Sequence, residues 1–133
     1  MTNFFKRSDL SRDEAENIVS DTLNKCDDGE LYLEDSKSES IILDDNKIKD
    51  SSYSSDLGFG FRAISDEVVA YSHSNEISKS SLKQSSESLK STLKSTKGTY
   101  NHSIPKSNKK YYESINPIEQ KSLNEKIEIL NKV

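Results

Sequence analysis

The stretch LGFGFRAISDEVVAYSHS, from Leu57 to Ser74, decides the fold class of this chain. In its first half, bulky apolar residues alternate with glycine, arginine and isoleucine, which is the period of two that a β-strand requires. The chain then turns at Ser65 to Glu67, and Val68 to His73 returns as a second strand. The stretch therefore predicts an antiparallel hairpin with one bulky apolar face.

Two glycines, Gly58 and Gly60, alternate with Phe59 and Phe61 in the first of these strands. A dinucleotide-binding fingerprint has glycines in the pattern G-x-G-x-x-G between a strand and a helix. Here no third glycine follows, and no helical pattern starts before Ser78. Glycines inside a strand mark instead a bulge, or a place where another backbone or a ligand comes close.

A helix is predicted on the N-terminal side of the hairpin, from about Ser11 to Cys26. Ser11 can cap it, and Glu14 completes a capping box. One apolar stripe at helical spacing follows, made of Ala15, Ile18, Val19, Thr22, Leu23 and Cys26. We expect Gly29 to end this helix in a left-handed conformation. Cys26 is the only cysteine, so no internal disulfide can form, and we expect a packed thiol.

The segment between this helix and the hairpin is predicted to form further strands. Glu30 to Glu34 and Glu39 to Asp44 alternate as strands do, and a hairpin turn is expected in the polar link from Asp35 to Ser38. A second turn is expected at Asp45-Asn46, and Lys47 begins another strand. These strands and the hairpin together predict a mainly antiparallel sheet.

A serine-rich helix is predicted after the hairpin, from about Ser78 to Ser95. Serine is a poor helix former, so this helix needs packing partners for its single apolar stripe. That stripe consists of Ile77, Leu82, Leu89 and Leu93. The expected fold class is therefore α+β, a mainly antiparallel sheet with helices packed on one face.

The domain organisation is predicted as three parts. Residues 1–98 form an α+β domain, 99–116 form a loop or linker with both prolines nearby, and 117–133 start a further helix. Ser122 and Glu125 supply a second capping box for that helix. Its pattern reaches the last residue without a stop signal, so we expect the chain to be truncated.

The composition limits the classes of protein that fit. Hydrophobic residues make up 31% and charged residues 32%, so there is little material for a large core. The net charge of -4 removes a whole-chain electrostatic attraction to nucleic acid. No signal peptide and no apolar run of membrane-spanning length is recognisable. We expect a cytoplasmic chain that binds neither membrane nor nucleic acid directly.

A resemblance to a known family rests on the order of several short motifs. They are Ile48-Lys49-Asp50, then Tyr53, then Gly58 to Arg62 with Ala63-Ile64, and finally Ala70 to Ser72 in the return strand. Together they resemble the N-terminal domain of the TldD/PmbA family. The likeness covers about residues 10 to 95, and the sequences IKD and RAIS favour the TldD branch.

The resemblance implies a zinc metallopeptidase that takes unfolded peptide into a long groove, in a family also described as modulators of DNA gyrase. In that family an H-E-x-x-x-H helix and a distant cysteine bind zinc, and the glutamate activates the attacking water. The only histidines here are His73 and His102, and neither is followed by glutamate. The resemblance therefore implies an N-terminal domain with no catalytic residue, no metal ligand and no activity alone. The motif is expected beyond Val133.

Two hypotheses about function follow. In the first, the chain is the peptide-groove or subunit-contact domain of a TldD-like peptidase, with a partner subunit in a homo- or heterodimer and unfolded peptide as ligands. Gly58, Gly60 and Arg62 are then the candidate residues for peptide binding or close backbone approach. In the alternative, the chain is a stand-alone binding or regulatory module, and Asp44-Asp45 with Asp50 meets a basic partner.

Overall fold

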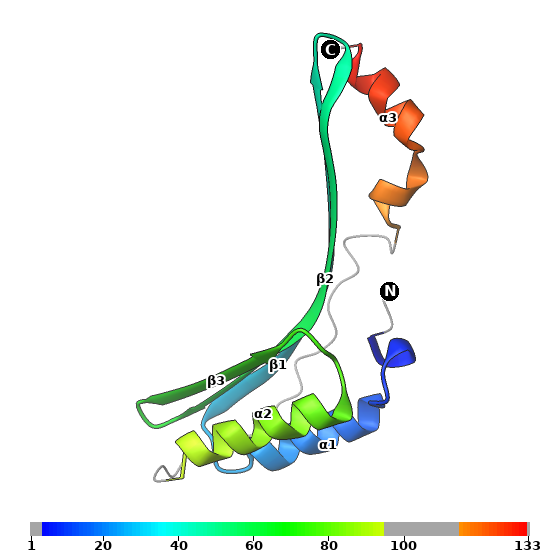
Figure 1. Ribbon diagram of the computed structural model, residues 1–133. Coiled ribbons are helices and arrows are strands. Elements are labelled where there is room, and N and C mark those ends of the chain that lie inside the picture. The colour runs from blue at the N-terminus through cyan, green and yellow to red at the C-terminus, as the bar shows by residue number, and fades with distance from the viewer. Residues whose placement is uncertain (1–3, 95–114, 133) are drawn as a thin grey trace. The chain divides into compact units, whose positions relative to one another are not determined.

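The computed structural model describes residues 4–94 and 115–132 (Figure 1). Three strands form one sheet in the order β1-β2-β3, and the predicted α+β class is confirmed. The elements in chain order are η1 (Phe4–Arg7), α1 (Arg12–Leu23), β1 (Asp28–Asp44), β2 (Lys47–Ser65), β3 (Val68–Ser74), α2 (Lys79–Thr92), η2 (Pro117–Gln120) and α3 (Leu123–Leu130).

The chain divides into two compact units. The two-layer unit contains the described residues before Ser36 and those from Leu57 to residue 94. The hairpin unit contains Ser36–Asp56 and the described residues from 115 to 132. Of the predicted linker at 99–116, residues 99–114 lie outside the described residues, as does His102.

Helix α1 begins where the sequence predicts it. The N–H of Glu14 donates to Ser11 Oγ, and the N–H of Ser11 donates back to the Glu14 carboxylate at 3.0 Å, which closes the capping box. The helix ends at Leu23, before the predicted end at Cys26. The prediction of a left-handed Gly29 is wrong, because no described glycine has positive φ and Gly29 lies in β1. A Cβ there would lie 2.3 Å from Leu23 Cδ2, so the glycine provides space.

The first two strands are longer than the sequence predicts. The expected hairpin at Asp35 to Ser38 is wrong, since Asp28–Asp44 is one strand. That link contains neither glycine nor asparagine, the residues that accept the left-handed conformations of a tight turn. Asp45 and Asn46 do form the predicted turn, with φ of 49° and 58°. The next strand then runs unbroken from Lys47 to Ser65.

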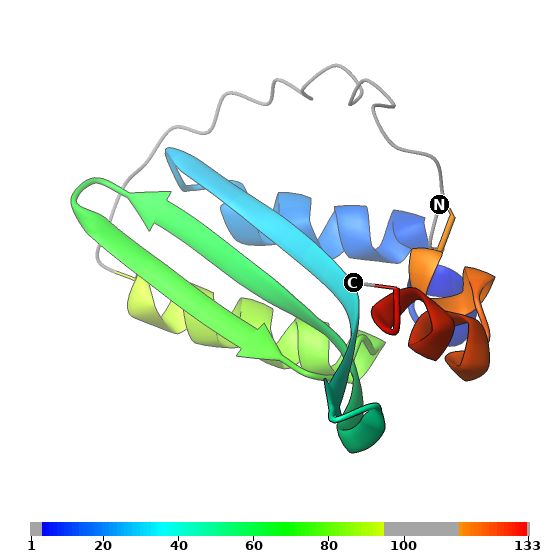
Figure 2. The same ribbon diagram turned by 90° about the horizontal axis from the view of Figure 1, so that it is seen from above.

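The core of the two-layer unit lies between one face of the sheet and the helices. Figure 2 shows α1 and α2 side by side on that face, as the single apolar stripe of each helix predicts. Phe61 and Ala63 of β2 are completely buried. The remaining buried apolar residues are Leu10, Ala15, Leu23, Cys26, Phe59, Ala70, Ile77, Leu82, Leu89 and Leu93.

Serine hydroxyls join α2 to its two neighbours. The hydroxyls of Ser86 and Thr22 on α1 lie 2.6 Å apart in the buried interface between the helices. On the sheet side, the hydroxyl of Ser72 on β3 donates to Ser85 at 3.0 Å. Small hydroxyl side chains let the elements approach closely while each buried polar group keeps a hydrogen-bond partner. The weak intrinsic helix propensity of α2 is thus offset by tertiary contacts.

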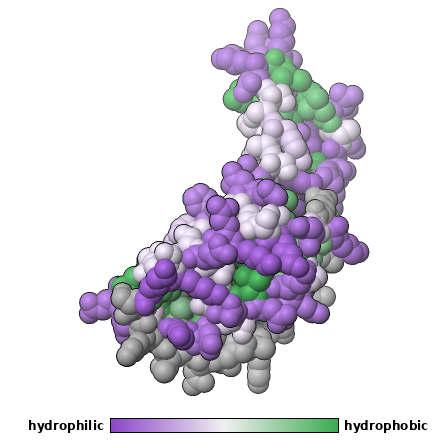
Figure 3. Space-filling model, turned by 60° about the horizontal axis from the view of Figure 1, so that its bottom comes forward, coloured by the Kyte–Doolittle hydropathy of each residue, from purple (hydrophilic) through white to green (hydrophobic). Residues whose placement is uncertain are grey.

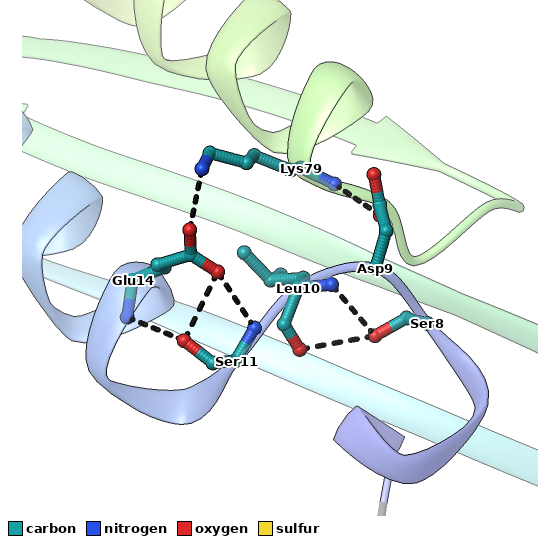
Figure 4. Close-up of polar contacts among 6 residues, drawn as sticks. All are labelled: Ser8, Asp9, Leu10, Ser11, Glu14 and Lys79. Atoms are coloured by element: carbon teal, nitrogen blue, oxygen red, sulfur yellow. Dashed lines mark hydrogen bonds and ion pairs between the residues drawn. The ribbon is translucent and has the colours of Figure 1, made fainter.

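A charged cluster connects the first turns of the two helices (Figure 4). The ammonium group of Lys79 bonds the Glu14 carboxylate, and the N–H of Lys79 donates to Asp9 at 2.9 Å. The same carboxylate accepts the N–H and hydroxyl of Ser11. These bonds, that of Lys79 first, lower the pKa of Glu14 from its usual 4.5 to about 2. Glu14 therefore both caps α1 and holds the start of α2.

Polar contacts also hold the hairpin unit together. Lys126 of α3 bonds the carboxylate of Glu39 on β1 and donates to the carbonyl oxygen of Ile118 at 2.7 Å. Lys37 pairs with Glu119 at 3.0 Å. Lys126 thus connects α3 to β1, and Lys37 connects β1 to η2.

Helix α3 starts with the predicted second capping box. Ser122 accepts the N–H of Glu125, and the carboxylate of Glu125 accepts the N–H of Ser122 at 2.7 Å. The Glu125 carboxylate also accepts the Ser122 hydroxyl at 2.7 Å, and the backbone bond followed by this hydroxyl bond lowers the pKa of Glu125. Among the helices of the described residues, none combines the length and the apolar character needed to cross a membrane.

We predict that the free energy of unfolding decreases as the pH falls from about 4.5 to about 2. The folded-state pKa of Glu14 is depressed, so its stabilisation is complete above 4.5 and is lost as the pH falls through about 2. Glu14→Gln should remove this part of the pH dependence, measured by urea unfolding with circular dichroism at each pH. The matched control Glu16→Gln removes a carboxylate of the same helix that pairs with Arg12. Identical pH profiles for Glu14→Gln and the unmodified chain would contradict the assignment.

Candidate functional site

The face of the sheet that points away from α1 and α2 in the two-layer unit is named the outer face here. On β3, Ala70 is buried in the core, whereas Val69 and Tyr71 are 59% and 63% exposed. The alternation of a strand places Val69, Tyr71 and His73 together on this outer face. Among the described elements the helices cover the opposite face, so no helix lies over these three side chains.

The space beside Gly60 is filled by an aromatic ring. A Cβ at Gly60 would lie 2.9 Å from the Tyr71 hydroxyl oxygen and 3.2 Å from Tyr71 Cε2. The Tyr71 ring also stacks on His73, with centroids 5.9 Å apart and an angle of 23° between the rings. Because Gly60 has no side chain, the Tyr71 ring can pack against the backbone of β2 at Gly60. In this position it stacks on His73.

Gly58 faces backbone atoms at the end of β3. A Cβ at this position would lie 2.6 Å from the carbonyl oxygen of Ser74 and 3.3 Å from the Cα of Asn75. In the sheet register, Ser74 is the partner of Phe59, the next residue of β2. Gly58 therefore lets the chain that leaves β3 pass close to β2.

Arg62, the third residue singled out from the sequence, crosses from β2 to β1. Its Nε donates to the Glu30 carboxylate at 3.1 Å, and its guanidinium lies 3.8 Å from Asp28. The Arg62 side chain is 37% exposed, so these pairs are partly screened by water. In the register Arg62 is the partner of Tyr71 on the same face of the sheet, but its guanidinium extends toward β1 and away from β3.

The edge of β3 is defined by the register of the β2–β3 hairpin. In a hairpin with a two-residue turn, the pair beside the turn is hydrogen-bonded and the following pairs alternate. Ser65 and Val68 flank the turn, so the partner pairs of Val69, Tyr71 and His73 are the non-hydrogen-bonded ones. These three residues direct their backbone N–H and C=O groups to the outer edge, and β3 is the end strand of the sheet in the described residues.

The two edges of the sheet differ in charge. Within the two-layer unit, the edge strand β1 carries four acidic residues, Asp28, Glu30, Glu34 and Asp35. Strand β3, VVAYSHS, contains no Asp, Glu, Lys, Arg, Pro or Gly. Natural sheets protect exposed edges with charges, prolines or bulges, because unpaired backbone groups recruit another strand. The β3 edge lacks this protection, which is typical of an edge that accepts a strand.

Comparison with known proteins places this architecture in a family. Residues 29–96 match the family model described as PmbA/TldA metallopeptidase domain 1. The chain belongs to the TldD/PmbA family. The family resemblance inferred from the motifs is therefore confirmed, for the N-terminal domain.

Two relatives show how much of a TldD-type protein the chain represents. It is 34% identical over 108 residues to the metalloprotease TldD homolog of Buchnera aphidicola from Acyrthosiphon pisum, covering 80% of this chain and 22% of that protein. It is 33% identical over 113 residues to the Haemophilus influenzae homolog, with 80% and 23% covered. The chain thus spans less than a quarter of the length of these relatives.

The residues present do not fit the zinc centre that the family implies. Within residues 4–94 and 115–132, no group of three or more His, Cys, Asp and Glu side chains is placed to hold a metal ion. His73 stacks on Tyr71. Cys26 is 2% exposed, and burial followed by the charge of Asp27 raises the pKa of its thiol. The buried Cys26 thiol is therefore not accessible as a metal ligand or nucleophile here.

From the sequence alone, Val69, Tyr71 and His73 were not identified as a binding edge. Gly58 and Gly60 were candidates because glycines are unusual in a strand, and Arg62 because it projects from the same face. All three lie on β2, the neighbour of β3. The signal for the edge was the absence of charge from Val68 to Ser74 in a chain with 32% charged residues. That absence acquires its meaning only once β3 is known to be an end strand.

We predict that a methyl group is tolerated much better at Gly60 than at Gly58. At Gly60 the obstructing atoms belong to the exposed Tyr71 ring, which can swing away, so Gly60→Ala should cost less than about 1 kcal/mol. At Gly58 the obstructing atom is the backbone carbonyl of Ser74, so Gly58→Ala should cost about 2 kcal/mol. Urea unfolding measures both values. Equal losses would show that close backbone approach is not the reason for Gly58.

Proposed function

We propose that this chain is the N-terminal, peptide-binding domain of a TldD-like metallopeptidase that acts on unfolded polypeptides. The observation that carries the proposal is the uncharged, unprotected edge of β3. The finding that the chain belongs to the TldD/PmbA family, with relatives named metalloproteases, supports the peptidase part. We assign this role to the part of the predicted domain 1–98 that forms the two-layer unit, which carries the β3 edge.

Backbone chemistry identifies an extended strand as the ligand of this edge. Val69, Tyr71 and His73 offer N–H and C=O groups at every second residue, which is the spacing that a β-strand presents to its neighbour. Pairing through main-chain groups is independent of side-chain sequence. An unfolded polypeptide meets this requirement at any point along its length, whereas a folded protein has already paired these groups.

The outer face next to the edge adds contact area for the bound strand. Alternate side chains of a strand beside β3 would lie next to the stacked rings of Tyr71 and His73. In this proposal Gly60 makes room for the Tyr71 ring and Gly58 lets the end of β3 pass close to β2, whereas Arg62 supports the outer face from the β1 side through Glu30. The candidate residues of β2 thus support a binding edge on β3.

Cleavage itself belongs to other parts of a TldD-type protein. Zinc would supply a polarised water for attack on the peptide carbonyl, and the printed sequence contains no H-E-x-x-x-H pattern to bind it. The contribution of the present residues is to hold an extended substrate. Binding, and not hydrolysis, is therefore the activity to measure on this chain.

We predict that Val69→Pro weakens binding of unfolded polypeptide by about tenfold. A tenfold loss corresponds to about the free energy of one main-chain hydrogen bond. Proline removes the outward N–H of Val69 while the ladder to β2 keeps its bonds, because that N–H does not point to β2. Val69→Thr is the matched control, since it keeps the β-branched shape and the N–H. Fluorescence anisotropy of labelled β-casein, an unfolded polypeptide, measures the affinity.

Circular dichroism on each variant separates loss of binding from loss of folding. A folded Val69→Pro variant that binds β-casein as tightly as the unmodified chain would overturn the assignment of the β3 edge. Absence of any β-casein binding by the unmodified chain would overturn the peptide-binding role and leave the hypothesis of a regulatory module.

A further inference from the structure

The charged residues of α2 all lie in one row along the helix. Residues three or four positions apart lie on the same side of a helix. The row with this spacing consists of Lys79, Lys83, Glu87 and Lys90. At its two ends Lys79 bonds Glu14 and Lys90 bonds Asp21, and both carboxylates belong to α1. The charged row therefore lies on the side of α2 that is next to α1.

A second row of α2 at the same spacing carries no charge. It consists of Ser81, Ser85, Ser88 and Thr92. The buried hydroxyl of Ser85 accepts a hydrogen bond from Ser72 of β3, so this row lies on the side of α2 that is next to β3. Ser88 and Thr92 are exposed, and Ser81 is half-buried. Ser81, Ser88 and Thr92 are named the hydroxyl flank here.

An exposed helix flank without charge is unusual in this chain. Charged residues make up 32% of the sequence, and Figure 3 shows mostly hydrophilic side chains on the face of the molecule that it presents. Serine and threonine are weaker helix formers than lysine or glutamate, so helix stability does not explain their use at exposed positions of α2. The uncharged character of the β3 edge thus continues onto the helix beside it.

A strand paired to the β3 edge would direct every second side chain to the helix side of the sheet. Figure 2 shows α2 on the β3 side of the helix layer and α1 on the β1 side. The inward side chains of the bound strand therefore meet the hydroxyl flank. A charged group placed there loses part of its hydration, and the flank itself supplies no opposite charge.

The outward side chains of the same strand meet a different environment. They lie beside Val69 and Tyr71, which are 59% and 63% exposed. A charged group on this side keeps most of its contact with water, so it binds without a comparable loss of hydration. The two sides of the β3 edge therefore differ in the charges that they tolerate.

We propose that the β3 edge selects extended segments whose charged side chains all lie on one face, with uncharged residues at every second position. This inference rests on the proposed function, because it concerns the strand that β3 binds. Alternation of polar and uncharged residues is the pattern of half-buried strands in folded proteins. The ligand class is thus the amphipathic strand of a protein that has unfolded, and segments with consecutive charges are disfavoured.

Two eight-residue peptides of identical composition test the charge pattern. TETETETE can direct all of its glutamates to the outer face, because a shift by one residue exchanges the two faces of a strand. TTEETTEE has glutamates on both faces in every register. We expect fluorescence anisotropy with the full chain to show about tenfold weaker binding of TTEETTEE. TQTQTQTQ and TTQQTTQQ are the matched controls, and they should bind equally because glutamine has the size of glutamate without its charge.

Ser88→Lys adds a cation to the hydroxyl flank and tests where the discrimination arises. The added lysine can pair with an inward glutamate, so we expect this variant to recover most of the binding that TTEETTEE lacks. Ser20→Lys is the matched control, since Ser20 is exposed on α1 and the substitution adds the same charge to the other helix. Lysine is a better helix former than serine, so both variants should fold, and circular dichroism checks this.

The outcomes separate this inference from the proposed function. Equal binding of TETETETE and TTEETTEE, with both glutamine peptides bound, overturns the selection by charge pattern and leaves peptide binding by β3 intact. A recovery that is no larger with Ser88→Lys than with Ser20→Lys also overturns it, because the hydroxyl flank then does not set the discrimination. Failure of all four peptides to bind overturns both proposals. Weaker binding of TTEETTEE that only Ser88→Lys restores supports the inference.

Discussion

Burial of the inward face of β2 is the constraint on which the two-layer unit depends. Phe61 and Ala63 have no exposed surface, and Phe59 has little. Because side chains of a strand alternate, burying these three residues commits Gly60 and Arg62 to the outer face. Within the described residues the helices cover only the inward face, and no element lies over the outer face or beside β3. The same burial that stabilises the unit therefore also fixes which side chains the outer face presents.

The helices that complete this core depend on it in turn. Helix α2 is rich in serine and contributes little stability by itself. Its buried Ser85 and Ser86 use their hydroxyls to reach β3 and α1, and Lys79 ties its first turn to Glu14. In this small domain, polar side-chain contacts thus supply stabilisation that additional buried apolar residues supply in a larger domain. Such contacts are directional, so they set the position of the helices as well as their stability.

In the proposed function, the two-layer unit contributes shape and main-chain groups to a TldD-type protein. Its buried thiol and its stacked histidine are both occupied in packing. The β3 edge presents unpaired main-chain groups, and the hairpin unit exposes apolar side chains. In the proposed function, the edge therefore suits a ligand defined by its extended conformation and not by its sequence.

The sequence by itself determined the features that arise between near neighbours along the chain. Both capping boxes, the turn at Asp45-Asn46, the β2–β3 hairpin and the apolar stripes of α1 and α2 follow from spacings of a few residues, and so does the α+β class. The family followed from the order of such local motifs. These predictions were correct because the physics of caps, turns and strand alternation is local.

Only the tertiary structure decided that β1 continues through Asp35 to Ser38 and that β3 is an end strand of the described sheet. The link at Asp35 to Ser38 is polar like a turn, yet strand pairing keeps it extended. Gly29 looked like a helix stop and instead makes room for Leu23, while Gly60 makes room for Tyr71. Each of these depends on residues distant in sequence that pairing and packing bring together. The uncharged β3 became a candidate site for the same reason, because an edge exists only relative to the rest of a sheet.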